Sequence, residues 1–374
     1  MRLFKLAIGI GAAAAAAMWV TTSSVSAQLG RSGAAVEVLQ NRAGAAGYWT
    51  AERMAAAQPV AEKIPVASPL LNLPDASGAP VTHDAWAPAG KVPTAAAQLY
   101  DPAEARSQLQ LLRDTVSPQL YGTSGARFSS SRLVPATTTT DQAYPHRVIG
   151  KLFFTIPGAG NYVCSASIIS YRLIATAGHC VASGTGTWYS NFAFVPALRD
   201  GAGPWGSYNW AYAITTPAWF SGGGGVPNAG DYAMIELGDK NNTTIGGLLG
   251  WLGWRTLSLS GNHAHLMGYP CNLDSCNQMH QVTAQAHGNA ANNTVTYGSN
   301  MRGGSSGGPW IMNFGLQSTC DEGCGGSDTG TNRIIGITSY GPVATDPLYQ
   351  GASILDAQWT SMWTTACGHR VGNC

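Results

Sequence analysis

The chain from Val148 to the C-terminus alternates short apolar runs with glycine-rich connections, a pattern typical of β-strands joined by tight turns. The last apolar segment, Ala352–Thr365, carries Ile354, Trp359 and Trp363 and predicts a helix. Repeated short strands with one late helix favour an all-β fold, built as barrels or as a sandwich. The predicted strands are Gly150–Ile156, Tyr162–Ile169, Leu173–Thr176, Asn191–Pro196, Trp210–Thr215, Tyr232–Leu237, His265–Tyr269, Gln281–Ala286, Thr294–Tyr297, Pro309–Asn313 and Ile334–Thr338.

The first 147 residues show a different pattern. Arg2 and Lys5 precede an alanine-rich apolar run at 6–20, and small residues at 25–27 form a cleavage site. Residues 1–27 are therefore expected to be a secretory signal peptide. The run is shorter than the roughly 20 residues of a membrane-spanning helix, which argues against a membrane anchor.

Residues 28–147 are rich in Ala, Pro, Ser and Thr and contain no cysteine. They have little strand pattern and one helical pattern, at Ala103–Val116. This region is predicted to be a largely irregular propeptide or linker, and a spacer that stays attached is the alternative. The folded domain is then expected to span 148–374.

Composition narrows the compartment and the function. Only 10% of the residues are charged and the net charge is +1, so a nucleic-acid-binding surface is not expected. The even number of cysteines, all after residue 163, favours disulfides in an exported protein. We therefore expect a secreted protein, extracellular or periplasmic, that is a monomer without stable membrane association.

Three motifs carry the candidate chemistry. Thr176-Ala177-Gly178-His179-Cys180 comes first, a segment beginning Asp231-Tyr232-Ala233 follows, and Gly304-Ser305-Ser306-Gly307-Gly308-Pro309 comes last. A serine hydroxyl needs a neighbouring base, and the base needs an orienting carboxylate. The order His, Asp, Ser with these flanks resembles the trypsin-like (chymotrypsin-fold) serine proteases.

The resemblance covers 147–374 and implies two six-stranded antiparallel β-barrels followed by a C-terminal helix. It implies that His179 is the general base, Asp231 the orienting acid and Ser306 the nucleophile of a secreted endopeptidase acting on proteins or peptides through an acyl-enzyme. The backbone amides of Gly304 and Ser306 would form the oxyanion hole. It also implies a Cys164–Cys180 disulfide. Nearest-neighbour pairing of the other cysteines is a guess: Cys271–Cys276, Cys320–Cys324 and Cys367–Cys374.

The segments 147–154 and 303–310 resemble the bacterial glutamyl endopeptidase branch. Ser305 stands where animal enzymes carry an Asp that pairs with the new N-terminal ammonium, so activation is expected to differ. The mature N-terminus is predicted at or near Val148. No Glu occurs between Glu104 and Glu236, so a strictly Glu-specific enzyme would not release this N-terminus itself.

Substrate preference is less determined. Asn300 aligns with the acidic pocket base of trypsin, which disfavours cleavage after Lys or Arg. Thr338 stands where glutamyl-specific relatives place a His, and Arg302 or the Val148 ammonium would have to replace it. The resemblance implies substrate binding by two segments: Asn300, Met301 and Arg302, and Thr338, Ser339, Tyr340 and Gly341.

Two other classes of function stay open. The spacing Gly304-x-Ser306-x-Gly308 also fits the nucleophile elbow of an esterase, with Asp346 or Asp356 and then His369 completing the triad. A non-catalytic binding protein using exposed Trp and Tyr is the other class. No cofactor and no metal are expected, because the remaining histidines have no carboxylate at a recognised ligand spacing: His263, His265, His280 and His287.

Overall fold

The computed structural model describes residues 25–29, 35–40, 47–60, 80–88, 97–103, 127–133, 139–256, 263–290, 293–315, 330–341 and 348–374. Most of the predicted signal peptide, nearly all of the helical pattern at 103–116, and Cys320, Cys324 and Asp346 lie outside these ranges. Within them, no helix combines the length and the hydropathy needed to cross a membrane.

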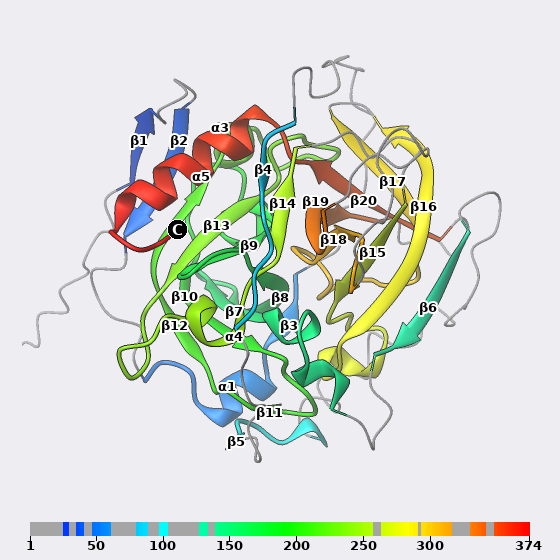
Figure 1. The fold of residues 1–374 in the computed structure, drawn as a ribbon. Helices are drawn as coiled ribbons and strands as arrows, with labels where there is room; N and C mark the ends of the chain where they lie inside the picture. Colours follow the sequence, from blue (N-terminus) through cyan, green and yellow to red (C-terminus); the bar gives the residue numbers. More distant parts are fainter. Residues whose placement is uncertain are drawn as a thin grey trace, which may run out of the picture.

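Six antiparallel strands close the first barrel (Figure 1). Their order is β12-β10-β7-β8-β9-β13, and pairing of β12 with β13 closes the ring. The barrel interior is apolar, as the run of buried residues along β7 shows. The strands are β7 (Ile149–Ile156), β8 (Gly160–Ile168), β9 (Leu173–Thr176), β10 (Ser190–Pro196), β12 (Tyr208–Thr215) and β13 (Ala233–Leu237).

A second barrel follows in the chain and has its own core. Its order is β18-β15-β16-β17-β20-β19, closed by pairing of β18 with β19. Tyr297 and Trp310 pack ring against ring inside it, with centroids 4.7 Å apart. The strands are β15 (His263–Gly268), β16 (His280–Ala290), β17 (Thr294–Gly298), β18 (Pro309–Met312), β19 (Arg333–Tyr340) and β20 (Tyr349–Ile354). The predicted two-barrel fold is confirmed.

The C-terminal helix α5 (Ala357–His369) is present but begins later than predicted. Asp356 caps the helix, because its side chain accepts a hydrogen bond from the Gln358 amide at 2.9 Å. Trp359, in the first turn of the helix, is buried. The prediction of helix at 352–354 is wrong, because Ala352 and Ser353 pair with neighbours on both sides in β20. The apolar run 352–355 is continuous with the helix in sequence, so hydrophobic pattern alone did not separate the two elements.

Several short helices, 3₁₀ turns and strands lie before the first barrel strand or in the connections between the barrel strands. The helices are α1 (Ala51–Ala55), α3 (Pro217–Phe220) and α4 (Ile245–Leu249). Single turns of 3₁₀ helix are η2 (Thr140–Gln142), η3 (His146–Val148), η4 (Gly178–Cys180) and η5 (Asp274–Cys276). The remaining short strands are β11 (Ala202–Gly203) and β14 (Gly253–Arg255), which pairs in parallel with β19.

The described parts of 25–147 lie on the barrels as added strands. They are β1 (Val25–Leu29), β2 (Ala35–Gln40), β3 (Gln58–Pro59), β4 (Thr82–His83), β5 (Ala97–Gln98) and β6 (Phe128–Arg132). β3 joins β8 at Tyr162–Val163, where β8 pairs with β7 on one edge but with β9 only from Ser167 on the other. β6 similarly takes the edge of β16 that β17 leaves open. An unpaired strand edge presents free backbone N–H and C=O groups, and β3 and β6 pair with these groups on β8 and β16.

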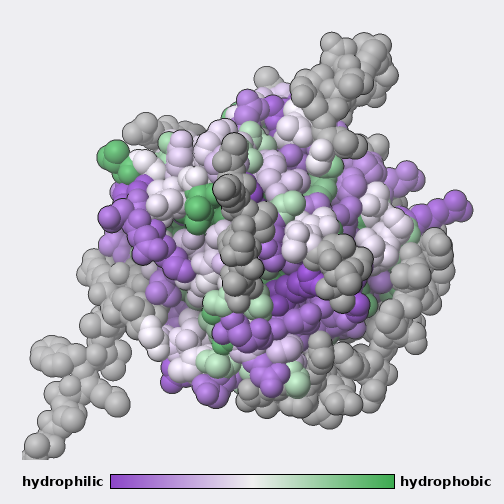
Figure 2. Space-filling view, turned by 60° about the horizontal axis from the view of Figure 1, so that its bottom comes forward, coloured by the Kyte–Doolittle hydropathy of each residue, from purple (hydrophilic) through white to green (hydrophobic). Residues whose placement is uncertain are grey.

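The face that carries α1, β5 and β11 is mostly hydrophilic, and its hydrophobic residues form small separate patches (Figure 2). Among the described residues, few large hydrophobic side chains are exposed, and they include Trp86 and Tyr171.

Candidate active site

His179 and Asp231 form a buried pair at the end of the first barrel. His179 lies in η4, directly after β9, and Asp231 lies just before β13. Because β9 pairs with β13, the two residues come together. Asp231 accepts the His179 backbone amide at 2.8 Å through Oδ1, and its Oδ2 lies 2.8 Å from His179 Nδ1. The side chains are 1% and 0% exposed, and a carboxylate buried so deeply requires such donors.

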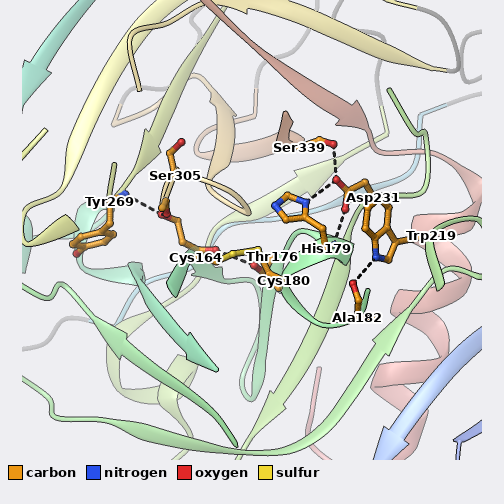
Figure 3. Close-up of a disulfide and its surroundings, with 12 residues drawn as sticks. Cys164, Thr176, His179, Cys180, Ala182, Trp219, Asp231, Tyr269, Ser305 and Ser339 are labelled. Carbon is orange, nitrogen blue, oxygen red and sulfur yellow. Dashed lines mark hydrogen bonds and ion pairs between the residues drawn. A yellow bond between two sulfur atoms is a disulfide. The ribbon is translucent and has the colours of Figure 1, made fainter. Parts of the chain in front are cut away.

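The second barrel contributes a third partner to this carboxylate. Ser339, on β19, donates its hydroxyl to Asp231 Oδ2 at 2.5 Å. Trp219, on α3, packs beside the imidazole with ring centroids 5.9 Å apart and donates its indole N–H to the Ala182 carbonyl. Figure 3 shows His179 and Ser339 converging on Asp231, with Trp219 next to the carboxylate. These contacts hold the imidazole in one orientation.

The orientation leaves one ring nitrogen available. Nδ1 donates to the carboxylate, so Nε2 is the atom with a lone pair. Nε2 is buried, and no polar atom of the described residues hydrogen-bonds to it. A buried, unpartnered nitrogen on an oriented histidine is the arrangement expected of a general base before its substrate arrives.

Ser306 lies beside two segments that are close to His179: β8 at Ser165 and the end of β9 at Thr176. Its carbonyl accepts the Ser165 amide at 2.7 Å, and Ser165 follows Cys164, whose disulfide partner Cys180 follows His179. A side chain at the next residue, Gly307, would collide with Thr176 Oγ1, three residues before His179. These contacts bring Ser306 and His179 into one region, although no hydrogen bond joins their side chains here. Such bonds are often long until substrate binds.

The loop before Ser306 leaves two amides free. The Gly303 carbonyl accepts the Cys271 amide at 2.7 Å, so the Gly304 N–H points the opposite way across a planar peptide. The Ser305 carbonyl accepts the Gly308 amide at 2.9 Å, which turns the Ser306 N–H outward in the same manner. Neither amide donates to any atom in the described part of the chain. Gly304 has a φ of +95°, and a Cβ there would collide with the backbone at Tyr269, so glycine is required.

The three predicted disulfides that fall within the described residues are present: Cys164–Cys180, Cys271–Cys276 and Cys367–Cys374; the fourth predicted pair, Cys320–Cys324, lies outside them. The first ties the histidine turn to β8 across a separation of 16 residues, and closing such a loop stabilises the fold by roughly 3 kcal/mol. The second lies behind Gly304, where its sulfur atoms fill the space that a side chain would need.

The residues expected to bind substrate occupy different environments. Met301 is buried in the core of the second barrel, and the Thr338 hydroxyl accepts the Trp310 indole N–H at 2.8 Å. Arg302 is buried and donates to the backbone carbonyls of Met301 and Ser299. Tyr340 lies over Gly351, and burial raises the pKa of its phenol. Asn300 is buried, and its carbonyl accepts the Asn272 side chain at 2.9 Å.

The alternative triad of an esterase does not assemble from the described residues. His369 Nδ1 lies 2.6 Å from Glu236 Oε2, and Asp356 accepts the Tyr232 hydroxyl while capping α5. His369 therefore lies against Glu236 on β13, where α5 covers the first barrel, and does not pair with Asp356. The residues that sequence reasoning missed are Ser165 and Gln350, which hydrogen-bond to Gly304 and Ser305 in the loop before Ser306, the predicted oxyanion loop.

Potential metal ligands also gather near the site, but their chemistry does not fit. In the described ranges, the His, Cys, Asp and Glu side chains that approach closely enough to share an ion are Cys164, His179 and Cys180. The two cysteines are joined in a disulfide and supply no thiolate. His280 instead contacts Asp274 at 2.8 Å, and His265 contacts Gln281.

Known proteins similar to the chain are proteases. No family model matches it. It is 27% identical over 205 residues to a glutamyl endopeptidase of Bacillus licheniformis, which covers 54% of the chain and 60% of that protein. It is 27% identical over 133 residues to an extracellular metalloprotease of Bacillus subtilis, which covers 34% of the chain and 40% of that protein. The matches thus span about half the length of these curated relatives.

A solved structure is similar as well. The protease Anisep from Arthrobacter nicotinovorans is 28% identical, with a TM-score of 0.48, over 59% of this chain and 96% of that one. Two closed six-stranded barrels with a C-terminal helix make up the trypsin-like fold, and within this fold the chain is similar in sequence to a glutamyl endopeptidase.

Proposed function

We propose that the chain is a secreted serine endopeptidase in which His179, Asp231 and Ser306 form the catalytic triad. The observation that carries this proposal is the His179–Asp231 pair, which orients the imidazole and leaves Nε2 buried without a partner. The free amides of Gly304 and Ser306 support it, because they lie on the same loop as the nucleophile. Secretion agrees with the signal-like N-terminus and the disulfides.

The reaction follows from these groups. His179 Nε2 takes the proton of Ser306 Oγ while Oγ bonds to the peptide carbonyl carbon. Negative charge develops on the carbonyl oxygen, and the Gly304 and Ser306 N–H groups stabilise it. His179 then protonates the leaving amine as the C–N bond breaks, and Asp231 stabilises the imidazolium between these steps. Water hydrolyses the acyl-enzyme by the same transfers in reverse.

An acidic residue before the scissile bond is the preference that the site supports. No carboxylate belongs to the expected pocket segments, and Arg302 places a buried guanidinium among them. A cation in a pocket of low dielectric attracts a carboxylate side chain. Thr338 stands where glutamyl-specific relatives carry a histidine, and its hydroxyl accepts the Trp310 indole N–H. The positive charge that a histidine would provide would therefore come from Arg302.

Part of the pro-region is proposed as an inhibitory partner of the site. Residues 47–60, the docking segment, comprise α1, β3 and their flanks. Pro59 lies against Gly303, directly beside the amide of Gly304: a Cβ added to Gly303 would come within 3.1 Å of the Pro59 Cβ. Upstream, the Trp49 indole N–H donates to the Asn191 carbonyl at 2.6 Å and the Tyr48 hydroxyl donates to Asn161 at 2.9 Å. The segment thus crowds the approach to the oxyanion loop in the intact chain.

The function is tested by labelling the secreted protein with a fluorophosphonate and by assaying Ser306→Ala on labelled casein and on an ester. The probe should modify Ser306, and the variant should lose peptide cleavage by about 10⁶-fold. Ser361→Ala, which removes a buried hydroxyl of α5, is the control and should keep full activity. Ester turnover without casein cleavage would identify an esterase, and absence of labelling would identify a binding protein.

The preference is tested with peptides that differ only in the residue before the scissile bond. Glu is expected to give the highest kcat/KM, and Arg302→Met is expected to lower kcat/KM for Glu peptides more than for neutral ones. A clear preference for aromatic or small residues would contradict the assignment of an acidic pocket without affecting the triad.

A further inference from the structure

The turn that carries the Gly304 amide is closed by Ser305. Both the amide and the hydroxyl of Ser305 donate to the Arg302 carbonyl, at 3.1 and 2.7 Å. The Ser305 carbonyl is also occupied, by the Gly308 amide. Every polar atom of Ser305 therefore has a partner, and the side chain is buried. The orientation of the Gly304 amide depends on this turn keeping its shape.

Gln350, on β20, hydrogen-bonds to the side chain of Ser305 in this turn. Its Nε2 donates to Ser305 Oγ at 2.6 Å, and its Oε1 accepts the Ser299 hydroxyl at 2.9 Å. The three side chains form one directional series: Ser299 donates to Gln350, Gln350 to Ser305, and Ser305 to the Arg302 carbonyl. All three side chains are buried, and hydrogen bonds in such a series strengthen one another in a medium of low dielectric.

The series has an anchor at each end and contains no charged side chain. Ser299 also accepts the Met301 amide at 3.2 Å, which ties the series to the segment before the turn. From the first barrel, Ser165 Oγ donates to the Gly304 carbonyl and accepts the Tyr269 amide, each at 2.9 Å. The loop is thereby fixed from both barrels while the chain is still uncleaved.

We propose that Gln350 is a positioning residue of the active site: through the Ser305 hydroxyl it holds the oxyanion loop in its working shape with neutral hydrogen bonds. Formation of the loop then requires no new N-terminal ammonium, and the intact chain already carries it. Activation then requires only that residues 47–60 leave the active site, because the oxyanion loop already has its final shape. The inference rests on the proposed function, because an oxyanion loop matters only if Ser306 is acylated.

The test compares Gln350→Met in the secreted protein with Asn373→Leu. Asn373 is a matched control, since it is a buried amide that donates to Glu236 and to the Ala366 carbonyl, away from the site. With the best peptide of the specificity series, Gln350→Met should lower kcat roughly 10- to 100-fold and leave KM within about threefold, because it weakens but does not remove one oxyanion donor. Asn373→Leu should leave kcat within about twofold of wild type.

A second variant shows whether Gln350 acts through Ser305. Ser305→Ala removes the same hydrogen bond with a smaller change in volume and should lower kcat similarly. Adding Gln350→Met to Ser305→Ala should then lower kcat little further, since the shared contact is already lost. Additive losses, equal losses in Gln350→Met and Asn373→Leu, or full kcat in Ser305→Ala would each overturn the proposal. Failure of Ser306→Ala to abolish cleavage would instead overturn the proposed function.

Discussion

At the scale of single residues, Lys151 shows how residues 28–147, the region predicted to be a propeptide, change the chemistry of the barrel against which they pack. Its side chain is 2% exposed on β7, with Nζ 3.3 Å from the hydroxyl of Tyr100 and 5.0 Å from the centre of the Phe153 ring. Burial lowers the pKa of the ammonium to about 7. Tyr100 lies in residues 28–147, which we predict to be a propeptide, so release of that region would remove this contact.

A pH-dependent stability of the intact chain follows from this burial. Between pH 7 and the ordinary Lys value of 10.5, the unfolded chain holds a proton that the folded chain lacks, so the free energy of unfolding rises with pH in this window. The full shift corresponds to at most about 5 kcal/mol. Lys151→Met should remove most of the rise, as measured by urea unfolding at several pH values.

Lys240→Met is the control for this prediction. Burial also lowers the pKa of Lys240, but that residue is half-buried and donates to the Trp205 carbonyl at 2.9 Å. Its removal should flatten the pH dependence much less. Equal slopes for wild type and Lys151→Met would show that the Lys151 proton is not lost on folding.

At the scale of elements, the added strands use edges that the barrels leave open. β2 pairs with β12 at Tyr212–Thr215, where β10 has already diverged after pairing at Asn209. β3 joins β8 immediately before Cys164, and it runs parallel to β8. The barrels therefore bind the added strands through backbone hydrogen bonds, and side chains such as Trp49 and Trp86 add contact area.

The docking segment provides the prediction at this scale. Trp49→Ala removes the hydrogen bond to Asn191 and the packing on Phe153, whose ring centroid lies 5.4 Å away. Losing a partly buried tryptophan should raise the undocked population of 47–60 on the order of tenfold. The intact variant should therefore react with a fluorophosphonate about that much faster than intact wild type.

Trp86→Ala serves as its matched control. Trp86 also lies within residues 28–147, but its ring packs at a tilt against Trp251, with centroids 4.6 Å apart, and its backbone is hydrogen-bonded to that residue, beside β14. Its loss should not change the labelling rate. If both variants labelled at the wild-type rate, residues 47–60 would not restrict access to the site.

At the scale of the whole molecule, the predicted processing bond is part of the folded interior. Arg147 and Val148 are buried in η3, and the Arg147 guanidinium donates to the Leu249 carbonyl at 2.8 Å and towards the Pro88 carbonyl at 3.4 Å. A protease needs an extended, accessible chain, so cleavage after Arg147 requires η3 to open. Pro88 lies in the region predicted to be a propeptide, so undocking of its segment would remove one of the contacts that hold η3. Start of the mature chain at Val148 stays a prediction.

The sequence alone indicated an all-β fold of barrels or a sandwich, and its resemblance to the trypsin-like proteases implied the two barrels and the three candidate active-site motifs. These are local signals: apolar runs bounded by glycine turns, a cysteine beside His179, and glycines around Ser306. The boundary between β20 and α5 was predicted wrongly, because an apolar run paired on both sides has no period that separates it from a helix.

Tertiary structure alone decided how the active-site motifs are held. Ser339 on Asp231, Ser165 on Gly304 and Gln350 on Ser305 join positions 108, 139 and 45 residues apart. Serine and glutamine carry no local pattern that marks such a role, because their hydroxyl and amide groups bond to whatever the fold places beside them. The same holds for the shortest strands within residues 28–147: β3 and β4 have two residues each and no strand pattern of their own, and they form because the barrel strands present backbone edges to them.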